Sequence, residues 1–185
     1  ATDPQDPLLL PVDVVVASVR AVVQPISSSV IEAAPVRVRA GDRVDLTACV
    51  EALVGLGYER VDLVERRGQV AVRGGIVDVF PPSEEHAVRI EFWGDDVEEI
   101  RHFSVTDQRS LDLLEHGLLA PAVRELLLTD GVRAKARELA IGAPGIAEMC
   151  QKIAAGIPVE GMESLTAVLD VSMVTLVDLL PRGTQ

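Results

Sequence analysis

The sequence predicts an α+β fold, in which a small mixed or antiparallel sheet carries a packed helix, and three patterns lead to this prediction. Residues 58–109 contain short alternating apolar and polar runs separated by turn-forming residues, which is typical of an antiparallel meander. Residues 41–58 have the apolar spacing of an amphipathic helix. After residue 110 the chain becomes rich in Leu and Ala and favours helices, so strands and helices are segregated along the sequence.

The elements before the meander are predicted from run length and capping residues. Residues 12–17, "VDVVVA", form a continuous apolar run, which is typical of a parallel strand buried on both faces. Residues 18–26 favour a short helix that Pro25 ends, and residues 35–39 alternate as an exposed edge strand does. The amphipathic helix should begin after Asp45 and end at Gly55 or Gly57, with one apolar stripe made by Leu46, Val50, Leu53 and Val54.

The meander is predicted to contain five strands, at residues 59–66, 69–73, 76–80, 88–93 and 97–103. The expected turns include Gly74–Gly75, as a hairpin turn rather than a phosphate-binding loop, and a segment that begins with Pro81 and Pro82. The last strand does not alternate cleanly, which indicates a β-bulge. Three short helices are expected to follow, at residues 131–140, 144–156 and 162–170.

Composition restricts the class of function. The formal net charge is −12, from 17 basic and 29 acidic residues, which argues against a general nucleic-acid surface. The two cysteines, Cys49 and Cys150, make no disulfide framework and suit a reducing cytoplasm. The sequence shows no signal peptide and no apolar run of the ~20 residues that cross a bilayer, so we expect a soluble cytoplasmic protein. Apolar, strand-like runs close to both ends suggest a piece of a larger protein.

The sequence shows no recognisable catalytic, metal or cofactor motif. It lacks the G-x-x-x-x-G-K-[ST] phosphate loop, a G-x-S-x-G element and any C-x-x-C pair. His86, His102 and His116 lack metal-ligand spacing and are interpreted as surface or turn residues. Asp95 and Asp96 are interpreted as a solvated turn rather than as paired catalytic carboxylates. We therefore predict no catalytic residue, no metal site and no cofactor in this chain.

Alternation within the strands assigns side chains to the two faces of the sheet. Val88, Ile90 and Phe92 share the core side, so Arg89 and Trp93, the only tryptophan, should point outward. By the same rule Val70 and Val72 point inward, whereas Ala71, Arg73 and Asp78 point outward.

The resulting outward face combines Arg73, Arg89 and Trp93. Arg and Trp are frequent anchors of protein–protein interfaces, so the face suggests a docking surface. The alternative interpretation is that Arg89 only pairs with Glu91 or Asp78, while Trp93 packs under a loop.

Residues 68–110 resemble the Mfd family, the bacterial transcription–repair coupling factors. The blocks "RGGIVDVFPP", "RIEFWGDD" and "TDQRS" carry this resemblance, in the family's order and spacing. The excision-repair subunit UvrB shares the first two blocks in looser form. The segments "GIPVEGMES" at 156–164 and "VVVASVRAVVQ" at 14–24 are also similar to coupling-factor segments, so the resemblance covers most of the chain.

The resemblance implies a UvrA-binding module in nucleotide excision repair. The family's contact residues fall on Arg73, Arg89 and Trp93, although the aromatic residue is usually Phe. Residues 31–115 would be the UvrA-binding domain, and residues 1–30 and 116–185 would be remnants of a helicase-like domain without an ATP site. The longer protein would be an ATP-driven DNA translocase, with ATP and Mg in its motor domains, that displaces stalled RNA polymerase from double-stranded DNA.

Three other functions have weaker support in the sequence. A piece of UvrB would need a P-loop and an aromatic-rich DNA-clamping hairpin, and a stand-alone enzyme would need a catalytic cluster. Direct DNA binding is supported only by a weak basic stripe, formed by Arg133 and Arg137 on one side of a predicted helix, and a solvated helix face explains this stripe equally well. Under the docking hypothesis, reversing the charge of Arg73 or Arg89 should abolish UvrA binding without unfolding the domain.

Overall fold

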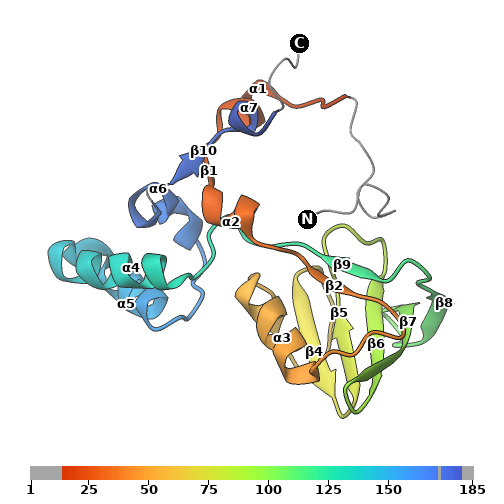
Figure 1. Cartoon of the computed structure of the whole chain (residues 1–185). Helices are drawn as coiled ribbons and strands as arrows, with labels where there is room; N and C mark the ends of the chain where they lie inside the picture. Colours follow the sequence, from red (N-terminus) through yellow and green to blue (C-terminus); the bar gives the residue numbers. More distant parts are fainter. Residues whose placement is uncertain (1–13, 171, 181–185) are drawn as a thin grey trace. The chain divides into compact units, whose positions relative to one another are not determined.

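The computed structural model describes residues 14–170 and 172–180 and divides them into two compact units (Figure 1). Unit 1 contains residues 34–123, and unit 2 contains residues 14–33 together with those described from 124 onward. The boundaries predicted from the sequence lie after residues 30 and 115. Both units mix helices and strands, and the α+β class is confirmed.

Unit 1 is built on a six-stranded sheet with the strand order β3-β4-β5-β6-β7-β8. All neighbouring pairs are antiparallel except β3 and β4, which are parallel. The strands are β3 (Glu59–Arg60), β4 (Gln69–Arg73), β5 (Ile76–Val79), β6 (Ala87–Trp93), β7 (Asp96–Phe103) and β8 (Ser110–Leu113). A separate antiparallel pair joins β2 (Val36–Val38) to β9 (Leu118–Ala120).

Unit 2 contains a two-stranded sheet and short helices. Strand β1 (Ile26–Ser27) pairs with β10 (Met173–Val174). Its helices are α1 (Val19–Val23), α2 (Ser28–Glu32), α4 (Asp130–Gly142), η1 (Pro144–Ile146), α5 (Ala147–Ala154), η2 (Met162–Leu165), α6 (Thr166–Leu169) and α7 (Leu176–Leu179). The three helical segments predicted after residue 130 are confirmed, as is the short helix before Pro25. Among the described residues, no helix is long and apolar enough to cross a membrane.

Helix α3 (Leu46–Gly55) packs along one face of the unit 1 sheet (Figure 1). It begins as predicted, because the side chain of Asp45 accepts a hydrogen bond from the backbone N–H of Ala48 at 2.7 Å. It ends at a Schellman motif, in which the Tyr58 N–H bonds to the Leu53 carbonyl and the Gly57 N–H bonds to the Val54 carbonyl. The buried stripe differs from the prediction: Cys49 takes the place of Val54, which is exposed.

The strand predicted for residues 59–66 is largely wrong, because only Glu59 and Arg60 pair with a neighbour. The amide oxygen of Gln69 accepts hydrogen bonds from the backbone N–H groups of Glu65 and Arg66, at 3.0 and 3.1 Å. A side chain thus satisfies backbone donors that a sheet ladder would otherwise take, and the segment turns instead of extending. The prediction also missed β8, the strand at the far edge of the sheet.

The buried strand predicted for residues 12–17 is also wrong over residues 14–17, whereas residues 12 and 13 lie outside the described part. Residues 14–17 are irregular, and Val14, Val15 and Val16 are exposed. A strand buried on both faces needs paired neighbours and covering layers. Within the described ranges no strand pairs with these residues.

The β4–β5 hairpin confirms the predicted turn at Gly74–Gly75. Arg73 pairs with Ile76, so the loop contains only the two glycines. Gly74 has a φ of +61° and Gly75 is not in the left-handed region, which is the sign pattern of a type II′ turn. Gly75 also contacts β6 closely, since its carbonyl accepts the Phe92 N–H at 2.8 Å. The turn that begins at Pro81 is present as well, closed by a hydrogen bond from the Glu84 N–H to the Pro81 carbonyl.

Replacing Gly75 with Ala should destabilise unit 1, because a Cβ atom there would lie 2.7 Å from the carbonyl oxygen of Phe92. We expect a loss of about 1–3 kcal/mol in the free energy of unfolding, measured by urea titration with circular dichroism. Gly55→Ala in α3 is the matched control, because no atom lies within 4 Å of its Cβ and Ala favours a helix. Equal stability of the two variants would contradict the close approach at Gly75.

The two thiols should report separately on the two units. Cys49 in unit 1 and Cys150 in unit 2 are both buried, and burial raises the pKa of the Cys49 thiol to about 11. Because the thiolate is the reactive form, neither cysteine should react with a disulfide dye at neutral pH until its unit unfolds. The variants Cys150→Ser and Cys49→Ser each leave one reporter for labelling in increasing urea. Rapid labelling of Cys49 without denaturant would contradict the packing of α3.

Candidate functional site

The candidate site lies on the side of the six-stranded sheet that carries Asp78 and Arg89, which we call the outer face. Cross-strand pairing places Ala71, Asp78, Arg89 and Arg101 in one row across β4 to β7. The next row contains Arg73, Ile76, Glu91 and Glu99. Residues directly opposite each other point to the same side of a sheet, so Arg73 and Arg89 share a face as predicted.

Asp78 is the centre of this face because its carboxylate joins both guanidinium groups. Arg89 donates to it twice, from Nε to Oδ1 at 2.7 Å and from Nη2 to Oδ2 at 2.9 Å. Arg73 donates from Nη2 to the same Oδ2 at 2.7 Å. The side chain of Asp78 is only 1% exposed, so the two arginines supply the charge compensation that a buried carboxylate requires. These hydrogen bonds raise the pKa of Arg89 above its ordinary value, against the opposing effect of burial.

The prediction that Ala71, Asp78 and Arg89 are displayed to solvent is wrong, although they lie on the predicted side. A small apolar cluster covers part of the outer face, formed by Val64, Ala71, Phe80, Ala87 and Phe103. The guanidinium of Arg89 stacks over the Phe103 ring at 4.6 Å, and its side chain is only 11% exposed. The loop that replaces the predicted strand at 59–66 supplies Val64, which alternation within the strands did not anticipate.

Arg73 and Trp93 are the accessible members of the predicted set. Arg73 ends β4 and its side chain is 46% exposed. Trp93 ends β6 opposite Asp96 and is 75% exposed, so the alternative that it packs under a loop is wrong. The other half of that alternative is confirmed, because Arg89 does pair with Asp78.

The hairpin tip that carries Trp93 is held by backbone hydrogen bonds to residues 41–44. The Gly41 N–H donates to the Val97 carbonyl, the Val97 N–H to the Asp42 carbonyl, and the Val44 N–H to the Asp95 carbonyl, at 2.8, 2.9 and 2.7 Å. Asp95 and Asp96 lie exposed at this tip, as the interpretation of a solvated turn requires.

Sequence reasoning missed the ion pair of Arg101 with Glu99, which continues the outer face onto β7. Arg101 lies opposite Arg89 and Glu99 lies opposite Glu91, so like charges face each other across β6 and β7. Each arginine is neutralised by its own carboxylate, which offsets the repulsion. The bulge predicted in the last strand is confirmed at Glu98 of β7, which is left over because the neighbours Glu91 and Phe92 on β6 pair with Glu99 and Val97. Placing that bulge would have revealed the pair.

Charge reversal at Arg89 would not leave the fold intact, contrary to the expectation from sequence. A glutamate at this position would face the buried carboxylate of Asp78, and removing one partner of a buried ion pair costs about 3–5 kcal/mol. For Arg73, whose side chain is far more exposed, it stays a prediction.

Three histidines and two arginines of α4 are the other groups of chemical interest among the described residues. No group of three or more potential metal ligands occurs in the described part of the chain. His86 and His116 are exposed, whereas His102 lies half-buried in β7 with Nε2 3.2 Å from a carboxylate oxygen of Glu84. Arg133 and Arg137, the basis of the DNA-binding alternative, both donate to the Ala154 carbonyl at the end of α5, at 3.3 and 3.4 Å.

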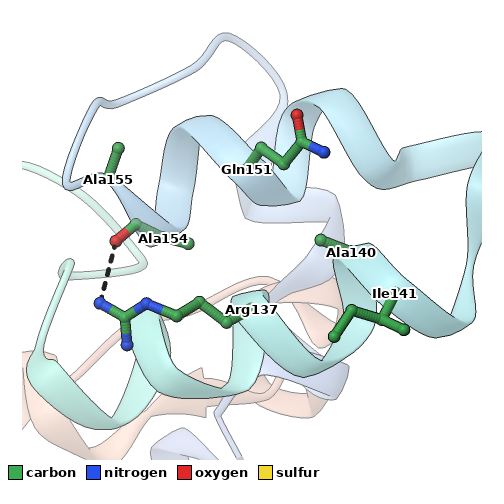
Figure 2. A pocket seen from close by; sticks show the side chains of 6 residues that line it. All are labelled: Arg137, Ala140, Ile141, Gln151, Ala154 and Ala155. Carbon is green, nitrogen blue, oxygen red and sulfur yellow. Dashed lines mark hydrogen bonds between the residues drawn. The ribbon is translucent and has the colours of Figure 1, made fainter.

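A hollow of about 440 Å³ lies between α4 and α5, and Figure 2 shows its lining residues. These are Arg137, Ala140, Ile141, Gln151, Ala154 and Ala155. Arg137 is the one charged residue in this lining and already donates to a backbone carbonyl (Figure 2). The described lining thus presents one guanidinium, already hydrogen-bonded, beside one amide and four apolar side chains.

Comparison with known proteins agrees with a docking domain. Residues 36–124 match the family described as the UvrB interaction domain. The transcription-repair-coupling factor of Mycobacterium bovis is 46% identical over 184 residues, which cover 94% of this chain and 15% of that protein. That of Myxococcus xanthus is 39% identical over 145 residues, 74% of this chain and 12% of that protein.

UvrB proteins match less of the chain. UvrABC system protein B of Geobacillus kaustophilus is 39% identical over 88 residues, 47% of this chain and 13% of that protein. The match to the Mycobacterium bovis coupling factor thus covers nearly all of this chain but only about 15% of the length of that protein. Its residues 36–124 belong to the UvrB interaction domain family, in a chain related to the transcription-repair-coupling factors and, over a shorter segment, to UvrB.

Proposed function

We propose that unit 1 is a protein-interaction module that docks on UvrA, the damage-recognition ATPase of nucleotide excision repair. The observation that carries the proposal is the exposure of Arg73 and Trp93, which strand pairing and alternation along β6 assign to one side of the sheet. A buried carboxylate holds the guanidinium of Arg73 in place. Arg and Trp dominate the binding energy of many protein interfaces, because they combine large buried area with directed hydrogen bonds. Family membership supports the same partner.

The three predicted contact residues have different parts in this proposal. Arg73 uses Nη2 for Asp78, which leaves its other N–H groups for a carboxylate or carbonyl of the partner. Trp93 offers an indole ring and an N–H donor at a hairpin tip. Arg89 is nearly enclosed, so its main part is to fix Asp78 and, through it, Arg73.

For the longer protein we propose the activity that the resemblance implies, an ATP-dependent DNA translocase that displaces stalled RNA polymerase from double-stranded DNA. The coupling-factor relatives over 94% of the chain support this reading over a UvrB fragment. Unit 2 would then belong to the helicase-like region that flanks the docking domain. No step of ATP chemistry is assigned to this chain.

Arg73→Glu and Trp93→Ala should each weaken UvrA binding by tenfold or more while leaving the fold intact, because both side chains are accessible. Losses of about 2 kcal/mol are typical of interface hot spots. The measurement is a titration of purified UvrA followed by calorimetry, with circular dichroism as the test of folding. Lys152→Glu is the matched control, since Lys152 is 49% exposed and also pairs with one carboxylate, but lies on α5 in unit 2. Wild-type affinity in both variants would reject the assigned surface.

Asp78→Asn should reduce both stability and UvrA affinity. The substitution keeps the size of the side chain but removes the charge that two arginines share at a site only 1% exposed. We expect about 3 kcal/mol less free energy of unfolding, because the guanidinium of Arg89 would be left enclosed without its counter-charge. Thermal unfolding and UvrA titration test the two effects. Asp112→Asn, on the exposed strand β8, is the control and should change neither.

A further inference from the structure

The loop between β7 and β8 contains an unusual backbone conformation at Gln108. Its φ is +61°, and it is the only residue other than glycine with positive φ in the described part of the chain. Such a left-handed conformation costs a residue with a side chain roughly 1 kcal/mol or more, so surrounding contacts must hold it.

Hydrogen bonds from both the backbone and the side chain hold Gln108 in place. Its backbone N–H donates to the Ser104 carbonyl at 2.8 Å, and the Ser104 N–H donates to the Arg109 carbonyl at 2.9 Å. Its side-chain Nε2 donates to the carbonyls of Val105 and Val64, at 2.9 and 3.5 Å. These bonds fix the loop against the segment that covers the outer face.

The consequence is that the carbonyl oxygen of Gln108 faces Arg89. Nη1 of Arg89 donates to this oxygen at 3.4 Å, on the part of the guanidinium that Asp78 does not engage. The guanidinium carbon of Arg89 also lies over the Phe103 ring, so the guanidinium is held by a carboxylate, a carbonyl and an aromatic face. Arg89 and Arg73 both donate a hydrogen bond to Oδ2 of Asp78. This shared carboxylate oxygen connects the loop, through Arg89, to the exposed Arg73.

We propose that Gln108 is a positioning residue for the docking surface: its left-handed backbone aims a carbonyl at Arg89, which orients the Asp78 carboxylate and thereby the exposed Arg73. The proposal rests on UvrA docking as the function of this face. It assigns the effect to the backbone carbonyl and not to direct contact of the glutamine side chain with the partner. The other charged neighbours of Arg89 are Arg101, directly opposite it, and Glu91, on the same strand.

A comparison of Gln108→Ala with Gln108→Gly separates the effect of the backbone conformation at this position from the effect of losing the side-chain amide. Both variants lose the amide, but glycine adopts positive φ without strain and keeps the carbonyl aimed at Arg89. Alanine favours a relaxed backbone that turns the carbonyl away. We expect Gln108→Ala to bind UvrA about fivefold more weakly than wild type, with Gln108→Gly recovering most of the loss.

Double variants test whether the effect passes through Arg89. In an Arg89→Lys background the difference between Ala and Gly at position 108 should vanish, because lysine lacks the Nη1 group that donates to the Gln108 carbonyl. In a Trp93→Ala background the difference should persist, since Trp93 ends β6, four residues beyond Arg89. The signal of the Arg89 Nε–H in ¹⁵N NMR spectra gives a readout without UvrA: its exchange with solvent should be faster in Gln108→Ala than in Gln108→Gly.

The outcomes are distinguishable. If Gln108→Ala binds like wild type, or if Gly is as weak as Ala, the positioning role is wrong. If the Ala–Gly difference survives unchanged in the Arg89→Lys background, the effect does not pass through Arg89 and the proposal is again wrong. If wild type itself does not bind UvrA, the proposed function fails, whereas the NMR comparison still decides whether Gln108 orients Arg89.

Discussion

The carboxylate of Asp78 is the constraint on which the candidate site depends. It is almost fully buried on β5, and such a charge is tolerated in a protein only when it is paired and hydrogen-bonded. Arg89 from β6 and Arg73 from β4 supply that pairing, so three neighbouring strands are joined on one face. The same bonds that neutralise the charge hold a half-exposed guanidinium in a defined place, which would link stability to the proposed docking.

Alternation predicted which side of the sheet each residue occupies, and it was right for Arg73, Asp78, Arg89 and Trp93. It failed for exposure, because the cover over Asp78 and Arg89 comes from Val64 and Phe103, which belong to a loop and to a strand beyond a bulge. A loop has no period from which its packing can be inferred. The Gln69 amide that turns the chain at residues 65–66 is likewise a tertiary contact without a local signal.

Helix α3 was predictable almost to its ends, since Asp45 and Gly57 act through hydrogen bonds within a few residues. The run at residues 14–17 shows the opposite case. Its valines have strong β propensity, yet propensity forms no strand without a partner, and the described residues provide none. Local signals thus predicted caps and turns, whereas strand pairing and the enclosure of the site depended on contacts distant in sequence.

The bracing of the β6–β7 tip against residues 41–44 has a thermodynamic consequence for association. An aromatic side chain on a mobile loop must lose backbone entropy when a partner immobilises it, whereas three backbone hydrogen bonds have already ordered the segment around Trp93. Little further ordering cost would remain in the proposed complex, so more of the free energy from burying the indole would be retained. Such preorganisation lengthens the lifetime of a bound state more than it accelerates encounter.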